Sequence, residues 1–376
     1  MVATQQRPAA PSRAEYERRT SALRTLIDDM GLEGVIVYGS SMRPGPLLYL
    51  SGYVPTNGFA CLHFNSEDET LLTDQPWDVA QARETLWLRR EAVLASDDIG
   101  SDVAQLVGSS QRIGVVGWEL LPAGVADQIR GAGAGTELVD IGGEAALLRI
   151  VKSDEEIALL REACRITSEG AAAFATNAVA GITERELAAS VESAMRTAGS
   201  GPLAFPLVLG AGAYQTASAV PLPGDGVLAD GDMVLIDCGA TFQGYCGDMA
   251  RALVVGTASV DQRRLLESTH AIFNECEALL GPGVKGTEVH RLATDVAIAG
   301  GYTLPFLLGH GIGCQNWEPP FLSGEDVTEF APGMIITLEP GIYVPDVGGA
   351  RLENTFLITE TGAEALTSGP IDLWEN

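Results

Sequence analysis

The stretch LIDCGATFQGYCGDMAR, residues 235–251, indicates the fold of the second part of this chain. Asp237 ends an apolar run, and Asp248 follows after two glycine-rich turns. This pattern predicts paired strands, each carrying one acid. A carboxylate at the end of an apolar strand is poorly solvated, and its burial without a partner costs free energy. The stretch therefore predicts a site that supplies a partner for both acids.

Residues 333–359 repeat this arrangement, with Glu339 at the end of an apolar run and Glu353 on the return strand. Each of the two stretches follows two predicted helices and one predicted strand. The helices are expected at about 154–177, 183–198, 260–280 and 287–299, and the strands at 206–212 and 302–308. The capping boxes SDEE (153–156) and TERE (183–186) open the first two helices. The doubled order predicts two similar lobes about a pseudo-twofold axis, with all four carboxylates converging at its centre.

The first part of the chain has a different pattern. Its predicted elements are helices at 14–29, 78–90 and 101–108 and strands at 34–39, 47–52, 59–64, 69–73, 112–117 and 137–141. Alternation of strands and helices favours an α/β domain. We therefore predict an α/β (α+β) chain, with an N-terminal α/β domain at 1–150 and a second domain at 151–376 built from the two helix-helix-strand-hairpin halves.

Composition limits the function of the chain. Its 376 residues are 46% hydrophobic, and a formal net charge of −27 argues against nucleic acid or an anionic membrane as a partner. The six cysteines have no paired spacing, which favours free thiols in a reducing compartment. The N-terminus lacks the apolar core of a signal peptide, and no apolar run reaches the ~18 residues of a membrane span. These features predict a soluble, cytoplasmic protein.

His310 lies among three glycines in GHGIGCQNWEPP, residues 309–320, in a chain with four histidines. Four carboxylates buried together repel one another strongly, and two divalent cations would relieve that repulsion. Oxygen donors with a single imidazole nitrogen suit Mn, Fe, Co or Zn better than a thiolate-selective metal. We therefore predict two divalent ions held by the four acids and His310. The alternative is a set of ordinary turn acids with a hydrogen-bonded core histidine.

The segments LIDCGATFQGYCGDMAR, GHGIG, TLEPGIY and ARLENT resemble the signature segments of the pita-bread metallopeptidase family. That family includes prolidase, aminopeptidase P, methionine aminopeptidase and creatinase. The resemblance covers residues 151–376 and extends weakly into the first domain through LLYLSGY and LLRIVKSDEEI, as in the creatinase, prolidase and aminopeptidase P branch. It implies a creatinase/prolidase-like first domain, a pita-bread catalytic domain, and a homodimer in which the partner's first domain helps to wall the site.

By this resemblance the five metal ligands are Asp237, Asp248, His310, Glu339 and Glu353, with Asp248 and Glu353 bridging two ions. A hydroxide held between the ions would be the nucleophile, and one metal would polarise the substrate. Glu339 lies where the family places a carboxylate that shuttles the proton of that water.

Two histidines with which the family holds its substrate are absent from this chain. By the family spacing, Val220 and Trp317 stand at these positions, and no other histidine is close enough in the sequence to replace them. Losing one donor to a developing oxyanion costs ~10²–10³ in rate, so Xaa-Pro cleavage by this route is disfavoured. Trp317 would instead wall the pocket, where its ring either binds a cation or fills space. The nearby groups that could replace the lost donors are Tyr214, Gln215, Cys314, Gln315, Asn316 and Arg351.

The resulting hypothesis is a dinuclear-metal-dependent hydrolase, related to Xaa-Pro peptidases, that acts on a small non-prolyl or non-peptide substrate. Its predicted catalytic residues are Glu339, Trp317, Arg351 and Tyr214, and Arg351 would pair with a substrate carboxylate or orient a ligand. Three alternatives stay open. They are a metal-dependent lyase resembling dimethylsulfoniopropionate lyase, a true Xaa-Pro dipeptidase or aminopeptidase, and a catalytically dead binding module like the peptidase-like domain of a histone chaperone.

Overall fold

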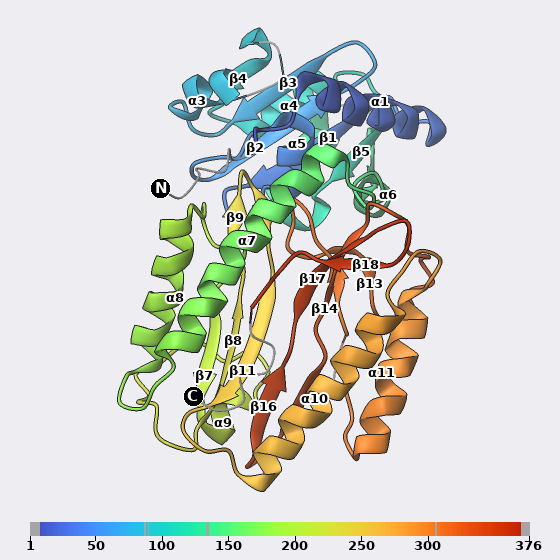
Figure 1. Cartoon of the computed structure of the whole chain (residues 1–376). Helices are drawn as coiled ribbons and strands as arrows, with labels where there is room; N and C mark the ends of the chain where they lie inside the picture. Colours follow the sequence, from blue (N-terminus) through green and yellow to red (C-terminus); the bar gives the residue numbers. More distant parts are fainter. Residues whose placement is uncertain (1–7, 86–87, 89, 133–134, 305–306, 370–376) are drawn as a thin grey trace. The chain divides into compact units, whose positions relative to one another are not determined.

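The computed structural model describes residues 8–369 except 86–87, 89, 133–134 and 305–306 (Figure 1). The chain divides into two compact units, one spanning Ala10–Arg149 and the other consisting mainly of the residues from Ile150 onward. None of the helices in the described ranges combines the length and the apolar character that a bilayer span requires.

The N-terminal unit is built on a mixed sheet whose described strands have the order β4-β3-β2-β1-β5-β6. Its strands are β1 (Gly34–Ser40), β2 (Phe59–Phe64), β3 (Glu69–Thr73), β4 (Val93–Ala95), β5 (Arg112–Val116) and β6 (Glu137–Asp140). Its helices are α1 (Arg13–Asp29), α2 (Gly45–Ser51), α3 (Asp78–Thr85), α4 (Ile99–Val107), α5 (Ala123–Ala132) and α6 (Gly142–Leu147), with short 3₁₀ helices η1 (Arg90–Ala92) and η2 (Trp118–Leu120). Apolar side chains of α4 and α5 pack on those of β1 to β3 and form the core of this unit.

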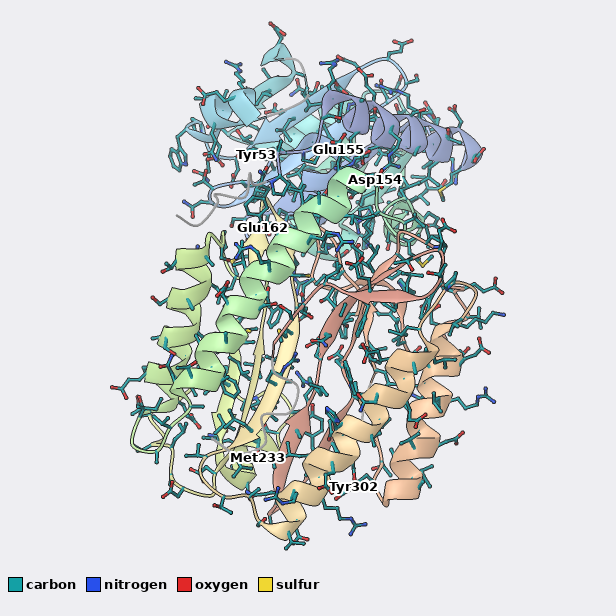
Figure 2. All side chains as sticks on the ribbon, viewed as in Figure 1. Tyr53, Asp154, Glu155, Glu162, Met233 and Tyr302 are labelled. Carbon is teal, nitrogen blue, oxygen red and sulfur yellow. The ribbon has the colours of Figure 1, made fainter. Side chains whose placement is uncertain are left out.

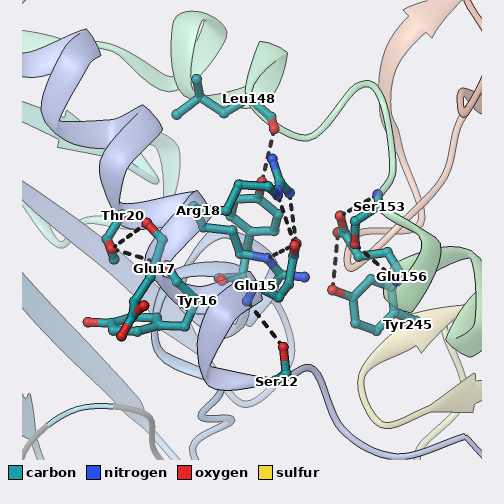
Figure 3. Close-up of polar contacts among 12 residues, drawn as sticks. Ser12, Glu15, Tyr16, Glu17, Arg18, Thr20, Leu148, Ser153, Glu156 and Tyr245 are labelled. Carbon is teal, nitrogen blue, oxygen red and sulfur yellow. Dashed lines mark hydrogen bonds and ion pairs between the residues drawn. The ribbon is translucent and has the colours of Figure 1, made fainter.

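Helix α1 shows how local sequence sets an element and its packing. Ser12 caps the helix by accepting a hydrogen bond from the backbone N–H of Glu15 at 3.2 Å. The buried Glu15 carboxylate accepts further bonds from Arg18 and Arg19, each at 2.7 Å (Figure 3 shows the Arg18 contact). Burial raises the pKa of Glu15, but the two guanidinium groups lower it by more, so this pKa lies below its usual range.

The strand predicted at 47–52 is wrong, because most of LLYLSG lies in α2. Every residue of this helix is buried, so its apolar run carries no period that separates a helix from a buried strand. Pro46 suits the first turn of a helix, and Gly52 ends it with a left-handed φ of 75°. The helix predicted at 78–90 is also too long, since α3 ends at Thr85; positions 86–87 and 89 lie outside the described residues. β4, α5 and α6 form where no element was expected.

The C-terminal unit contains the doubled order predicted from the sequence. The first half consists of α7 (Asp154–Asn177), α8 (Glu184–Ala198), β7 (Val208–Ala211), α9 (Gly212–Thr216), β8 (Met233–Cys238), β9 (Thr241–Phe242), β10 (Tyr245–Cys246) and β11 (Met249–Val254). The second half consists of α10 (Val260–Leu279), α11 (Gly286–Gly300), β12 (His310–Gly311), β13 (Glu318–Phe321), β14 (Ile335–Leu338), β15 (Gly341–Val344), β16 (Gly348–Arg351), β17 (Asn354–Ile358) and β18 (Ala363–Ala365). In Figure 1, α7 and α8 lie beside the strands of the first half, on the left, and α10 and α11 lie beside those of the second half, on the right.

The strand predicted at 302–308 is wrong over its described residues, which have no regular structure; positions 305–306 lie outside them. The strand that follows α11 is instead the short β12, which carries His310. Tyr302, labelled in Figure 2, stands at the start of this segment. The guanidinium carbon of Arg264 lies 5.7 Å from the centroid of the Tyr302 ring.

Both predicted capping boxes are confirmed. Ser153 and Glu156 exchange hydrogen bonds at the start of α7, and Thr183 and Glu186 do so at the start of α8. Glu156 also accepts a 3.1 Å bond from the hydroxyl of Tyr245 (Figure 3), which attaches the helix start to β10. Acidic residues in the first turn, including Asp154 and Glu155 (Figure 2), suit the positive end of the helix dipole.

The two halves meet where β11 lies beside the return strand of the second hairpin. The backbone N–H of Glu353 donates to the carbonyl of Ala250 at 3.1 Å. The hydroxyl of Thr355 donates to the carbonyl of Asp248 at 2.9 Å, and Arg251 donates to the carbonyl of Glu353 at 2.6 Å. These bonds hold the acid-bearing ends of two hairpins, which are distant in the sequence, against each other.

Candidate metal centre

The structure brings the four predicted acids and His310 into one cluster. Asp237 lies on β8, Asp248 directly before β11, His310 on β12, Glu339 directly after β14, and Glu353 directly before β17. Nε2 of His310 is 3.5 Å from Oε1 of Glu339 and 3.7 Å from Oδ2 of Asp248. Each of these side chains stands at the end of a strand in a hydrogen-bonded ladder, so its position follows from the strand register.

Several buried carboxylate oxygens of this cluster have no hydrogen-bond partner among the residues that the structure describes. They are Oδ1 of Asp237, Oδ1 of Asp248 and both side-chain oxygens of Glu353. Ligand atoms of Asp248, His310 and Glu353 lie within 4.8 Å of one another, which is close enough to surround a metal ion. Hard oxygen donors with one imidazole suit a divalent cation. The residues therefore fit a metal site.

Electrostatics indicate the same fit. Burial, reinforced by the charges of neighbouring acids, raises the pKa of Asp248 and that of Glu353 well above the usual range. Burial also raises the pKa of Asp237, although Arg351 opposes the effect, and it raises the pKa of Glu339 to about 8. Without a cation, burial and mutual repulsion shift these groups towards their protonated forms, and Arg351 opposes this shift at Asp237.

His310 is prepared to act as a nitrogen donor. Burial lowers its pKa to about 4, so the ring is neutral at pH 7. Its Nδ1 lies 3.0 Å from the carbonyl of Gly311, and because a carbonyl only accepts, Nδ1 carries the proton and Nε2 presents its lone pair to the acids. The backbone N–H of His310 donates to the hydroxyl of Thr337 at 3.1 Å. A side chain at Gly311 would overlap the carbonyl of Pro319, which explains a glycine beside the histidine.

Arg351 lies next to the cluster with its guanidinium engaged in three directions. Nη1 forms an ion pair with Asp237, Nη2 donates to the carbonyl of Ala219 at 2.6 Å, and Nε donates to the hydroxyl of Tyr343 at 2.9 Å. Of the two roles predicted for Arg351, this geometry favours orienting Asp237 over pairing with a substrate.

Trp317 and Val220 lie at the margin of the cluster. The Trp317 ring packs edge-to-face on the His310 ring, with centroids 5.5 Å apart, and also contacts Phe321. Val220 follows Ala219, whose carbonyl binds Arg351. Each of the two side chains is 61% exposed. Tyr214, on α9, is 88% exposed, and no described contact joins it to the acids, so its role stays a prediction.

Sequence reasoning missed the residues that support the cluster from behind. Tyr343 was part of the quoted segment TLEPGIY, and its place four residues after Glu339 on the next strand was the available signal. Arg251, whose pKa burial lowers to about 10, is buried beside the acids and donates to Asn354 at 2.8 Å. Its signal was a basic residue three positions after Asp248 on a buried strand.

A model of metallopeptidase family M24 matches residues 158–360, which is more than half of the 376-residue chain. The chain belongs to metallopeptidase family M24. A model of the creatinase/prolidase N-terminal domain matches residues 19–151 of this M24 chain. The predicted fold is therefore confirmed as a two-domain α/β protein with a creatinase-type first domain and a pita-bread second domain. The chain is a metallohydrolase of the prolidase/aminopeptidase P branch.

Known relatives of this M24 chain agree with that placement. It is 28% identical over 353 residues to the Xaa-Pro dipeptidase of Pyrococcus furiosus, a match that covers 93% of this chain and 98% of the relative. It is 29% identical to an uncharacterized peptidase of Bacillus subtilis, with the same coverage. The crystal structure of the prolidase from Pyrococcus horikoshii superimposes with a TM-score of 0.87 at 27% identity and covers 94% of this chain and 99% of that one.

Proposed function

We propose that this chain is a dinuclear metallohydrolase that cleaves a small substrate other than an Xaa-Pro dipeptide. One observation carries the proposal: a complete cluster of four acids and one neutral histidine is flanked by apolar side chains at Val220 and Trp317. The resemblance to the family places substrate-binding histidines at those two positions. A retained cluster with altered walls is what a change of substrate would leave.

The proposed metal ligands are Asp237, Asp248, His310, Glu339 and Glu353, and the unpartnered oxygens of Asp237, Asp248 and Glu353 support this set. When bound, divalent ions would polarise the scissile carbonyl and lower the pKa of water. Mn, Fe, Co and Zn all suit these donors.

Other steps belong to side chains of the chain itself. Glu339 is the group placed to accept and release a proton, because its carboxylate lies inside the cluster with Oε1 3.5 Å from Nε2 of His310, at the position where the resemblance to the family places a proton shuttle. Arg351 holds Asp237 in place and Tyr343 supports Arg351 from the other side. Trp317 covers the His310 side of the site, excludes water there and offers an aromatic face to the substrate.

A true Xaa-Pro dipeptidase is the second candidate. It is favoured by the 28% identity to the Xaa-Pro dipeptidase of Pyrococcus furiosus, which extends over 93% of this chain. In that case other donors would have to take over from the absent histidines, and the exposed side chains of Tyr214 and Gln215, shortly before Val220 in the sequence, are two that we predicted for this role.

Hydrolysis assays separate the two candidates. Protein loaded with Mn, Co or Fe is offered Xaa-Pro dipeptides, non-prolyl dipeptides and small N-acyl amides, with Asp237→Asn protein as the blank. We expect metal-dependent hydrolysis of a non-prolyl compound and at most trace cleavage of the Xaa-Pro set. Efficient Xaa-Pro cleavage that disappears in the Asp237→Asn protein would refute the proposal in favour of the second candidate.

A double variant provides the matched control. Val220→His with Trp317→His restores an imidazole at both family positions and leaves the acid cluster untouched. If the apolar walls are what prevents Xaa-Pro cleavage, this variant should gain about 10²-fold or more in that reaction. No gain in a folded, metal-loaded variant would contradict the role given to the two positions.

The homodimer implied by the resemblance also stays a proposal. Light scattering on the full chain tests it directly. A monomer that retains full hydrolytic activity at all concentrations would contradict a site completed by a partner subunit.

A further inference from the structure

A buried ion pair lies behind Trp317. Nζ of Lys152 is 2.8 Å from Oε1 of Glu318, and the two side chains are 1% and 2% exposed. Lys152 stands shortly before α7, and Glu318 is the first residue of β13, directly after Trp317. The pair therefore joins the start of the C-terminal unit to the segment that carries the aromatic wall of the site.

The backbone at the lysine end of this pair is fixed. The N–H of Lys152 donates to the carbonyl of Gly333 at 2.9 Å, and the preceding residue, Val151, forms a β-bridge with Met334. Nζ of Lys152 also donates to the carbonyl of Ile150 at 3.3 Å. The ammonium group thus has a defined position relative to β14, the strand that ends at Glu339.

The glutamate end is joined to the strand of His310. Glu318 is the register partner of Gly311 in the β12–β13 ladder. The carboxylate of Glu318 is directed at Lys152, whereas the ring of Trp317, the residue directly before it, packs on the ring of His310. Gly313 packs on the pair, since a side chain there would overlap Oε1 of Glu318 and lie 3.3 Å from Cε of Lys152.

Stability alone is a weak reason for such a pair. Two apolar side chains of similar volume generally stabilise a core as well as a buried ion pair does, but they do not fix the orientation of the two side chains relative to each other. We propose that Lys152 and Glu318 are positioning residues that hold Trp317 against His310 and so set the shape of the substrate pocket. This inference rests on the proposed function in treating Trp317 as a wall of that pocket.

The deciding variant is Lys152→Met with Glu318→Leu, which keeps the buried volume and removes the directional bond. The full-length protein is labelled with 5-fluorotryptophan, and the Trp317 resonance among the five tryptophans is assigned by its loss in Trp317→Phe protein. We expect the double variant to stay folded with its Mn content unchanged, while the Trp317 resonance moves towards that of unfolded protein. With the substrate found in the hydrolysis panel, KM should rise about tenfold and kcat should change less than twofold, a loss of about 1.4 kcal/mol in binding.

An exposed ion pair of the same unit supplies the control. Arg161 and Glu364 are 43% and 47% exposed and pair at 2.6 Å, so Arg161→Met with Glu364→Leu should leave the Trp317 resonance and KM unchanged.

The outcomes are separable. A folded Lys152→Met/Glu318→Leu protein with an unchanged Trp317 resonance overturns the positioning role, and a moved resonance with unchanged KM overturns its link to the pocket. If no compound in the panel is hydrolysed, the proposed function fails while the resonance still decides the position of Trp317. If the double variant does not fold, Glu318→Asp replaces it. The shorter side chain of aspartate keeps the charge and should shift the Trp317 resonance. An unchanged Trp317 resonance in this variant refutes the inference.

Discussion

Removal of metal should make the stability of this protein depend on pH in a direction that the acid cluster determines. The perturbation is chelation of divalent ions, followed by urea unfolding at pH values from 6.5 to 8. Burial raises the pKa of Glu339 to about 8 and raises those of Asp248 and Glu353 well above their usual range. In the unfolded chain the same groups titrate near their ordinary values, at about 4 to 4.5.

The sign follows from proton binding. Between pH 6.5 and 8 the folded, metal-free protein holds protons on these carboxyl groups that the unfolded chain does not hold, so the free energy of unfolding falls as the pH rises. His310 acts in the opposite sense, because burial lowers its pKa to about 4 and its contribution to stability grows with pH. That growth is complete near pH 6.5, the ordinary value for histidine, so it does not offset the carboxyl groups above this pH.

The magnitude can be worked from these values. A window of about 1.5 pH units at about 1.4 kcal/mol per unit gives about 2 kcal/mol for each carboxyl group that stays protonated across it. The groups interact, so the protons leave in steps that belong to the cluster as a whole. Glu339, with a pKa of about 8, implies a loss of about 2 kcal/mol, and the raised pKa values of Asp248 and Glu353 act in the same direction. Bound cations would keep the carboxylates ionised, and Mn-loaded protein should show almost no slope over the same window.

The assay is urea unfolding followed by circular dichroism, with chelated and Mn-loaded samples measured side by side. Asp248→Asn protein is the control, since a neutral amide at this position removes one titrating group and should flatten the chelated curve. A metal-free protein whose stability stays constant or rises between pH 6.5 and 8 would refute the reasoning, because the acids would then be ionised without any cation.

Three further predictions concern single side chains. Gly311→Ala should destabilise the protein by about 2–3 kcal/mol in urea unfolding, because the added methyl group overlaps the carbonyl of Pro319. The control Gly124→Ala, in α5 with open space around it, should be neutral or stabilising by up to ~1 kcal/mol. Equal effects of the two substitutions would contradict the close approach of Pro319 to Gly311. Arg351→Met leaves Asp237 buried without its guanidinium partner and should cost about 3–5 kcal/mol in the metal-free protein; a loss under ~1 kcal/mol would show that the pair is dispensable. Glu353→Gln should lower the Mn content found by elemental analysis and abolish hydrolysis, and full occupancy in this variant would remove Glu353 from the proposed ligand set.

The acid cluster could be predicted from the sequence because Asp237 and Glu339 end apolar strands and Asp248 and Glu353 precede the returning strands. Strand periodicity and the doubled order of elements are local signals, and both were sufficient to place Asp237, Asp248, Glu339 and Glu353 near one another. The capping boxes at Ser153 and Thr183 were predicted for the same reason, since a cap is formed within four residues.

The remaining features depend on contacts between distant segments. LLYLSG forms α2 instead of a strand, because a short apolar run buried on every side has no period and only its packing selects the helix. The pairing of Lys152 with Glu318 and the bonds of Arg351 to Asp237 and Ala219 join residues far apart in the sequence, and neither spacing nor composition indicates them. Such partners appear only when the strand register is known.

The cluster and its walls come from different kinds of structure, and this difference bears on how the substrate can change. The acids and His310 stand at strand ends tied together by ladder hydrogen bonds within each half and by the bond from Glu353 to Ala250 between the halves, so moving one of them would disturb the sheets. Val220 follows a short helix in a connecting segment, and Trp317 precedes a short strand, each with a largely exposed side chain. Substitution at these two positions therefore alters what the site can hold at little cost to the fold, while the chemistry of the cluster is preserved. Under the proposed function, Xaa-Pro cleavage and hydrolysis of another small substrate are therefore alternatives on one metal centre, decided by two side chains that do not belong to it.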